Sequence, residues 1–165
     1  MKRNYINLIV AVFLLLNSNG IQAQTTEPKL NQVESLKQFE GQWRYEMKKD
    51  SGEYWDAKLL GKALVFTVYS ENMGKKNLMY QSSFGLDSKT GKIMGFVIFP
   101  NADYKTWIGS FVNKNKLVVD MVENFNPDKV SINCEFQFDS PDILTVTCFN
   151  KERVQIGFKK FNRIK

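Results

Sequence analysis

Histidine is absent from the 165-residue sequence, and this absence excludes much of the familiar chemistry of enzymes. Catalytic triads with an imidazole base, zinc sites with histidine ligands and haem held by a proximal histidine all need a residue that the chain lacks. We therefore expect no cofactor and no metal site of these kinds.

Cysteine is scarce, with two residues, Cys134 and Cys148, and no Cys-x-x-Cys spacing that would favour a redox-active dithiol. A turn signal at residues 139–142 predicts a hairpin of strands 130–138 and 143–150. In that hairpin the two cysteines face each other and point to the same side. We expect a cross-strand disulfide in an oxidising compartment, with two buried free thiols as the alternative.

Clustered positive charge is also missing. The formal net charge is +6, but the basic residues stand as singles and pairs, and no stripe of basic and aromatic residues is present. A nucleic-acid-binding surface is therefore not expected.

A long apolar run occurs at residues 8–16, which is too short to span a bilayer. It follows Lys2 and Arg3 and precedes the small residue Ala23, a pattern typical of a secretory signal. We predict that residues 1–23 are removed by cleavage after Ala23. Because no cysteine lies near this site, we expect no lipid or other stable membrane anchor, and a periplasmic or extracellular mature protein.

From Gln42 onward the apolar residues alternate, and turn signals such as 51–52 and 126–128 recur about every ten residues. Short strands joined by tight turns leave no room for crossover helices, so they pair as an antiparallel meander. Closing the meander removes its exposed edges. We predict an all-β fold, a single up-and-down barrel of nine to ten strands, with strands at 42–49, 54–60, 62–70, 76–87, 91–100, 104–112, 115–124, 129–138, 142–150 and 153–162.

The segment before the barrel, residues 24–40, predicts a short helix. Thr26 can cap it, Pro28 suits its first turn, and four apolar residues follow at helical intervals: Leu30, Val33, Leu36 and Phe39. We expect this amphipathic helix to close one end of the barrel in residues 41–165.

Three motifs mark the barrel region. Gly41-x-Trp43 opens the first strand, an Asp-x-x-Thr-Gly-Lys hairpin lies within residues 80–93, and Asn162-Arg163 ends the last strand. Together they resemble a bacterial lipocalin-like (calycin-type) family of uncharacterised function. The resemblance implies that Trp43 plugs the closed end beneath Arg163 through a cation–π contact. The chain lacks the helix pair of fatty-acid-binding proteins and the C-terminal helix of most lipocalins.

Alternation along the strands predicts which side chains face the interior. Trp43, Tyr45 and Met47 share one face of the first strand. The candidates to line a ligand site are Tyr45, Phe66, Tyr80, Ser82, Phe84, Phe99, Trp107, Phe111, Met121, Glu123, Phe136 and Phe158, together with Val97 and Val119. Such a lining suits a small hydrophobic or amphipathic molecule, which Tyr80, Ser82 or Glu123 would orient.

Three functions remain open at this point. The favoured one is a secreted barrel that binds a small apolar ligand, acting as a monomer or weak dimer. The second is a filled, ligand-free barrel with a structural or protein-interaction role. The third is a barrel isomerase or cyclase in which Tyr80 and Glu123 transfer protons.

Overall fold

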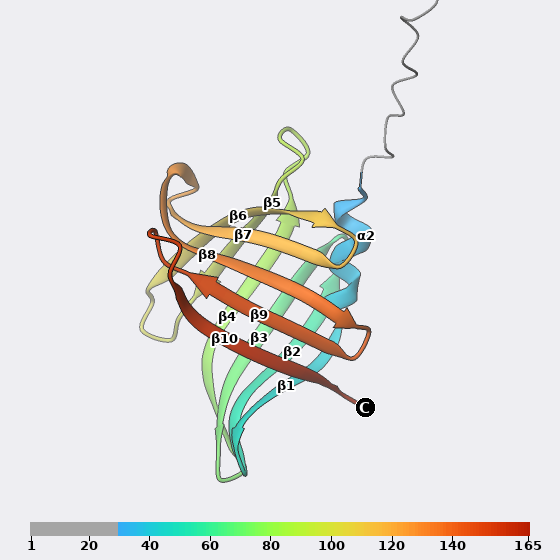
Figure 1. Cartoon of the computed structure of the whole chain (residues 1–165), viewed down its shortest axis with the longest axis vertical. Helices are drawn as coiled ribbons and strands as arrows, with labels where there is room; N and C mark the ends of the chain where they lie inside the picture. The colour runs from blue at the N-terminus through green and yellow to red at the C-terminus, as the bar shows by residue number, and fades with distance from the viewer. Residues whose placement is uncertain (1–29) are drawn as a thin grey trace, which may run out of the picture.

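The computed structural model describes residues 30–165, which form a closed antiparallel barrel of ten strands (Figure 1). Each strand pairs with its neighbours in sequence, and the first strand also pairs with the last. The prediction of an all-β up-and-down barrel is confirmed, and this architecture is consistent with a lipocalin-like fold. The strands are β1 Gly41–Lys48, β2 Ser51–Leu60, β3 Ala63–Asn72, β4 Lys75–Leu86, β5 Ile93–Ile98, β6 Tyr104–Asn113, β7 Lys116–Glu123, β8 Asn126–Ser140, β9 Ile143–Phe149 and β10 Gln155–Ile164.

Two predicted turns are shifted by a few residues. The first hairpin reverses at residues 49–50, where Asp50 has a φ of 58°, so the expected turn at 51–52 belongs to β2. The hairpin between β7 and β8 reverses at Asn124 and Phe125, both with positive φ, and the expected turn at 126–128 is the start of β8. Type I′ hairpin turns require positive φ at both central residues, which Asn124 and Phe125 adopt, whereas in the first hairpin only Asp50 does.

The Asp-x-x-Thr-Gly-Lys segment between β4 and β5 is a turn held by its own side chains. The Asp87 carboxylate accepts hydrogen bonds from the Thr90 hydroxyl at 2.6 Å and from the Lys89 backbone N–H at 3.0 Å. These two bonds lower the pKa of Asp87 below its ordinary value. Gly91 supplies the positive φ of 68° that the reversal needs.

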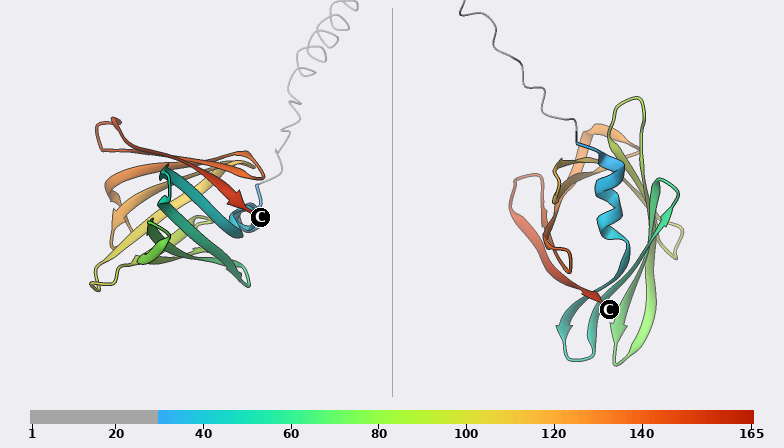
Figure 2. Two further views of the ribbon diagram at one scale, coloured as in Figure 1. Left: turned by 90° about the horizontal axis from the view of Figure 1, so that it is seen from below. Right: turned by 90° about the vertical axis from the view of Figure 1, so that its right-hand side faces the viewer.

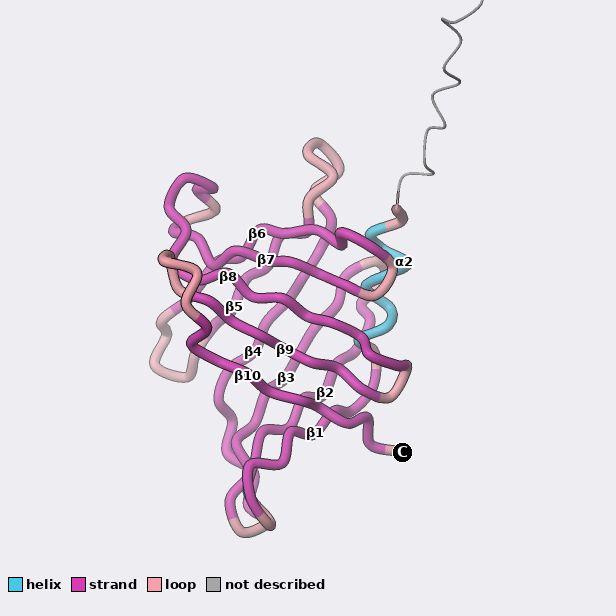
Figure 3. Tube along the Cα trace, in the orientation of Figure 1, coloured by secondary structure: helices cyan, strands magenta, loops and turns pink. Residues whose placement is uncertain are grey.

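Helix α2, Gln32–Leu36, continues into the 3-10 turn η1, Lys37–Phe39, at one end of the barrel. The helix begins after Asn31, whose side chain accepts a hydrogen bond from the backbone N–H of Glu34. The predicted cap Thr26 and the predicted signal sequence lie outside the described residues. The end-on view of Figure 2 shows α2 across the opening of the ring of strands, and Figure 3 shows loops at both ends of the wall.

The helical segment fills this end of the barrel because its last residue, Phe39, is fully buried among other rings. The Phe39 ring lies 5.6 Å from that of Phe66, 5.8 Å from that of Phe136 and 4.8 Å from that of Phe138. Burying a side chain of this size stabilises the fold by about 2 kcal/mol. Beside it, Trp43 is 0% exposed and its indole N–H donates to the Phe39 carbonyl at 2.7 Å. We call this the closed end.

Candidate functional site

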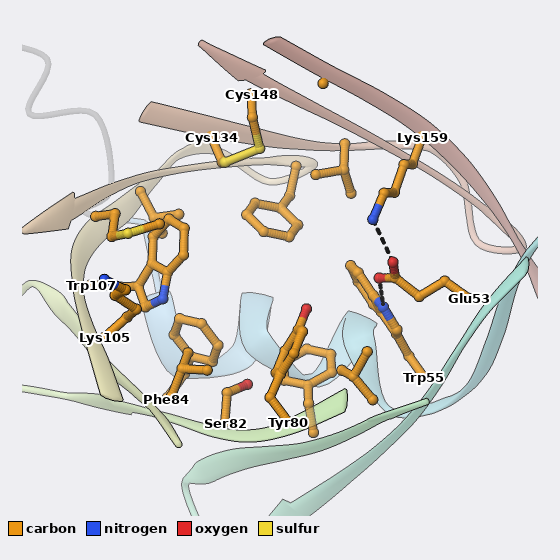
Figure 4. Close-up of a pocket in the computed structure, with 18 of the residues that line it drawn as sticks. Glu53, Trp55, Tyr80, Ser82, Phe84, Lys105, Trp107, Cys134, Cys148 and Lys159 are labelled. Atoms are coloured by element: carbon orange, nitrogen blue, oxygen red, sulfur yellow. Dashed lines mark hydrogen bonds and ion pairs between the residues drawn. A yellow bond between two sulfur atoms is a disulfide. The ribbon is translucent and has the colours of Figure 1, made fainter. Parts of the chain in front are cut away.

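The opposite half of the barrel contains a cavity of about 240 Å³ (Figure 4). Its floor includes Phe66 and Phe136, whose rings rest on Phe39, and Trp55, whose ring contacts both of them. Lys105 and Lys159 lie at its rim and reach solvent, so the cavity opens away from the closed end. Most other lining side chains are apolar or aromatic, as in sites that bind small organic molecules.

One wall carries a buried carboxylate that is already partnered. Glu53 is 6% exposed, and one carboxylate oxygen accepts a hydrogen bond from the indole N–H of Trp55 at 2.6 Å. The other oxygen forms an ion pair and hydrogen bond with the ammonium of Lys159, as the dashed lines in Figure 4 show. A buried charge needs such partners, so this three-residue group fixes the polar wall.

Two hydroxyl groups of β4 face the cavity across from that pair. The side chains of Tyr80 and Ser82 both point inward in Figure 4. Burial raises the pKa of the Tyr80 phenol, and the negative charge of Glu53 raises it further. Tyr80 therefore keeps its proton at neutral pH and can donate a hydrogen bond to a guest.

A third polar group in the cavity wall has no partner. The indole nitrogen of Trp107 is buried and forms no hydrogen bond within residues 30–165. Buried donors are almost always paired, so an orphan in a cavity wall calls for an explanation. An acceptor atom on a guest would supply the missing partner.

Two glycines shape the interior. Gly95 lies between Phe84 and Trp107 in the strand register, and a Cβ atom there would lie 2.7 Å from a carbon of the Phe84 ring. Gly157 faces Cys148, 3.7 Å from where its Cβ would stand. Gly95 thus makes room for two rings that line the cavity, whereas Gly157 leaves open space within it.

The predicted disulfide is confirmed and forms part of the cavity wall. Cys134 and Cys148 face each other between β8 and β9, and their sulfur atoms are bonded (Figure 4). Both residues line the cavity. The bond therefore holds together two strands next to the space that a guest would occupy.

Most of the predicted lining residues are brought together in the cavity. Those found there in the predicted inward orientation are Phe66, Tyr80, Ser82, Phe84, Val97, Phe99, Trp107, Val119, Met121 and Phe136. Two further predicted residues face inward but lie elsewhere. Tyr45 packs against Phe161 with ring centres 5.8 Å apart, and Phe111 is buried against Phe39 at the closed end.

Two inward assignments are wrong. Met47 is 68% exposed because the ladder between β1 and β2 is irregular after Glu46. Glu123 follows two register shifts in β7, lies in solvent and pairs with Lys129. Phe158 lines the cavity as predicted, although 56% of it is exposed.

The sequence contained a signal for the residues that were missed. Glu53 and Trp55 are two residues apart and therefore share one face of β2, and Trp55 pairs directly with the inward Trp43. Lys159 is likewise two residues before the buried Phe161, and Lys105 two residues before Trp107. Counting in twos from the aromatic residues places all three charged side chains inside, although charge argued for an outward position.

No helix within residues 30–165 is long and apolar enough to cross a membrane.

No protein-family model and no curated protein sequence matches this chain. The case for its function therefore rests on the cavity and the residues around it.

Proposed function

We propose that this protein is a secreted lipocalin-like carrier that holds a small, largely apolar molecule inside its barrel. One observation carries the proposal: a cavity of about 240 Å³, with rings on its floor and a few polar groups on its walls, in a barrel whose other end is filled. Apolar concave sites with a few convergent polar groups are the usual form of small-molecule sites.

The cavity argues against the filled, purely structural barrel. Side chains in protein interiors normally pack to crystal-like density, and leaving space beside aromatic rings forfeits their contacts. Here the inward position of β10 at Gly157 carries no side chain, while neighbouring inward positions carry Cys148 and Lys159. A larger residue at 157 would fill the space, so the opening depends on this glycine.

Gly157→Leu tests the proposal because its side chain would enter the cavity without meeting backbone. Gly85→Leu is the matched control, since a Cβ at Gly85 has no atom within 4 Å and the residue does not line the cavity. Protein purified from its own host is examined by native mass spectrometry, and displacement of a fluorescent lipid probe is measured in parallel. We expect a retained guest in the wild type and in Gly85→Leu, and its loss in Gly157→Leu. A wild-type protein that carries no adduct, and from which no fluorescent lipid probe can be displaced, contradicts the carrier function.

Secretion is part of the proposal and has its own support. The Cys134–Cys148 disulfide fits an oxidising compartment. The features of residues 1–23 fit a secretory signal. N-terminal sequencing of protein from the host should begin at Gln24. An N-terminus at Met1, with the protein in the cytoplasm, contradicts this part.

Catalysis is the second candidate, and one observation keeps it open. The pair expected from the sequence, Tyr80 and Glu123, is not brought together, because Glu123 lies outside the cavity. Glu53 and Lys159, however, form a partly buried ion pair within hydrogen-bond reach and share the cavity with Tyr80. Native mass spectrometry of Glu53→Gln separates the two functions. A carrier retains the same guest as the wild type or none, whereas an enzyme disabled at Glu53 retains a different molecule, its unconverted substrate.

A further inference from the structure

The hydrogen-bonding groups left free in the cavity are dominated by donors. The indole N–H of Trp107 can only donate, and so can the ammonium of Lys105. The hydroxyls of Tyr80 and Ser82 can donate as well. The carboxylate of Glu53 is the charged acceptor of the lining, and both of its oxygens are already engaged by Trp55 and Lys159. A guest that complements this site presents acceptor atoms.

The charged residues of the cavity also favour a guest with acceptor atoms. Three charged residues line it: Glu53, Lys105 and Lys159. Lys159 is neutralised by its ion pair with Glu53. Within residues 30–165, Lys105 forms no ion pair and is left as a positive charge at the rim.

Lys105 also lies where the cavity meets a second, more polar hollow. This rim hollow has a volume of about 820 Å³ and shares Lys105 and Met121 with the cavity. Among its charged residues, Lys129 is paired with Glu123. The remaining charges are the positive ones of Lys105 and Lys151 and the negative one of Asp128. A molecule with an apolar body in the cavity would therefore bring its other end to a polar surface of positive charge.

We infer that the guest is an amphipathic acid, with its apolar part between the rings of the cavity and its anionic group at Lys105. This inference rests on the proposed carrier function and adds the chemical class of the guest. A carboxylate at this point would accept a charge-assisted hydrogen bond from the Lys105 ammonium. A second acceptor atom nearer the cavity floor would satisfy the indole N–H of Trp107.

Three probes with one apolar skeleton test the inference: 2-naphthoate, 2-naphthylmethanol and 2-naphthylmethylamine. Isothermal titration calorimetry on the mature protein measures their affinities. We expect the acid to bind about tenfold more tightly than the alcohol, and the amine to bind most weakly. The advantage of the acid should shrink as salt is added, because Lys105 is exposed at the rim.

Lys105→Met keeps most of the length of the side chain and removes its charge, so it should cost the acid most of its advantage and leave the alcohol unchanged. Lys62→Met, in the turn between β2 and β3 at the closed end, is the control and should change none of the three affinities. Tightest binding of the amine overturns the inference and makes Glu53 the head-group site. Equal affinities for acid and alcohol that survive Lys105→Met also overturn it, but leave the carrier function intact where Gly157→Leu abolishes binding. Absence of binding by all three probes, together with no retained guest, removes the carrier function itself.

Discussion

The guanidinium of Arg163 lies over the indole of Trp43, 4.1 Å from the ring centre. It also donates hydrogen bonds to three backbone carbonyls, those of Gln38 at 2.8 Å, Pro141 at 3.0 Å and Glu40. One side chain thus joins the last strand to the first strand, the helical plug and the turn between β8 and β9. The cation–π contact implied by the resemblance to lipocalin-like barrels is present.

We predict that Arg163→Lys destabilises the protein by about 2 kcal/mol, although it keeps the positive charge. The planar guanidinium of arginine donates several hydrogen bonds in its own plane while its face stacks on an indole. The compact ammonium of lysine cannot do both. Urea unfolding followed by tryptophan fluorescence measures the loss. Lys165→Ala serves as the control, because this residue is exposed and pairs only at the surface with Asp142. Equal midpoints for Arg163→Lys and the wild type would show that the charge alone suffices.

We predict that the Cys134–Cys148 bond contributes about 3 kcal/mol, the magnitude typical of a loop of this length. The two residues are 14 apart in sequence. Urea unfolding with and without reductant should show a lower midpoint for the reduced protein. The double variant Cys134→Ala/Cys148→Ala should unfold at the same midpoint in both conditions. Two free thiols in the denatured, unreduced protein contradict the disulfide itself.

We predict that Gly95→Ala is destabilising because the added methyl group meets the ring of Phe84. Forcing a methyl group into a packed site typically costs about 1–3 kcal/mol. Removing the ring should relieve the clash, so Gly95→Ala should cost less in a Phe84→Ala background. A double-mutant cycle of unfolding free energies measures this coupling. Additive effects of the two changes would mean that the contact at Gly95 is relieved by other movements.

We predict a pH dependence at the alkaline end that arises from Tyr80. Its pKa is raised in the folded protein, while in the unfolded chain the phenol has its ordinary value of 10.0. Below pH 10 both states hold the proton. As pH rises further, the unfolded chain loses the proton first, so the free energy of unfolding falls by up to about 1.4 kcal/mol per pH unit until the folded pKa is passed.

Tyr80→Phe should lose stability less steeply than the wild type above pH 10, which urea unfolding at a series of alkaline pH values measures. Tyr104→Phe, a change at an exposed tyrosine, should keep the wild-type slope. Identical slopes for wild type and Tyr80→Phe would show that the phenol ionises as easily in the folded state as in the unfolded chain.

The fold could be predicted from the sequence because apolar and polar residues alternate with a period of two along nearly the whole barrel. Alternation and turn signals set the number and pairing of the strands, and the hairpin around residues 139–142 placed Cys134 opposite Cys148. Local chemistry thus settled the contacts between neighbouring strands. The closure of β1 on β10 followed from the need to remove two exposed edges.

The candidate site was predicted less completely, for two physical reasons. Alternation fails where the ladder shifts register, which put Glu123 outside the cavity and Met47 in solvent. Charge also argues for an outward position of Glu53 and Lys159, although Glu53 is buried and its ion pair with Lys159 compensates that burial. The volume of the cavity depends on how whole side chains pack, and periodicity carries no information about that.

Closure of the wall has a consequence for how the protein is made. β1 meets β10 through three facing pairs, Gln42 with Ile164, Trp43 with Arg163 and Arg44 with Asn162. β10 is the last strand in the sequence, so a partly folded chain in which it has not yet paired leaves β1 and β9 each with an unpaired edge that invites pairing with other chains. The barrel wall has no unpaired edge once β10 has paired with both β9 and β1. Folding before β10 has paired is therefore the stage at which association through strand edges is open to this protein.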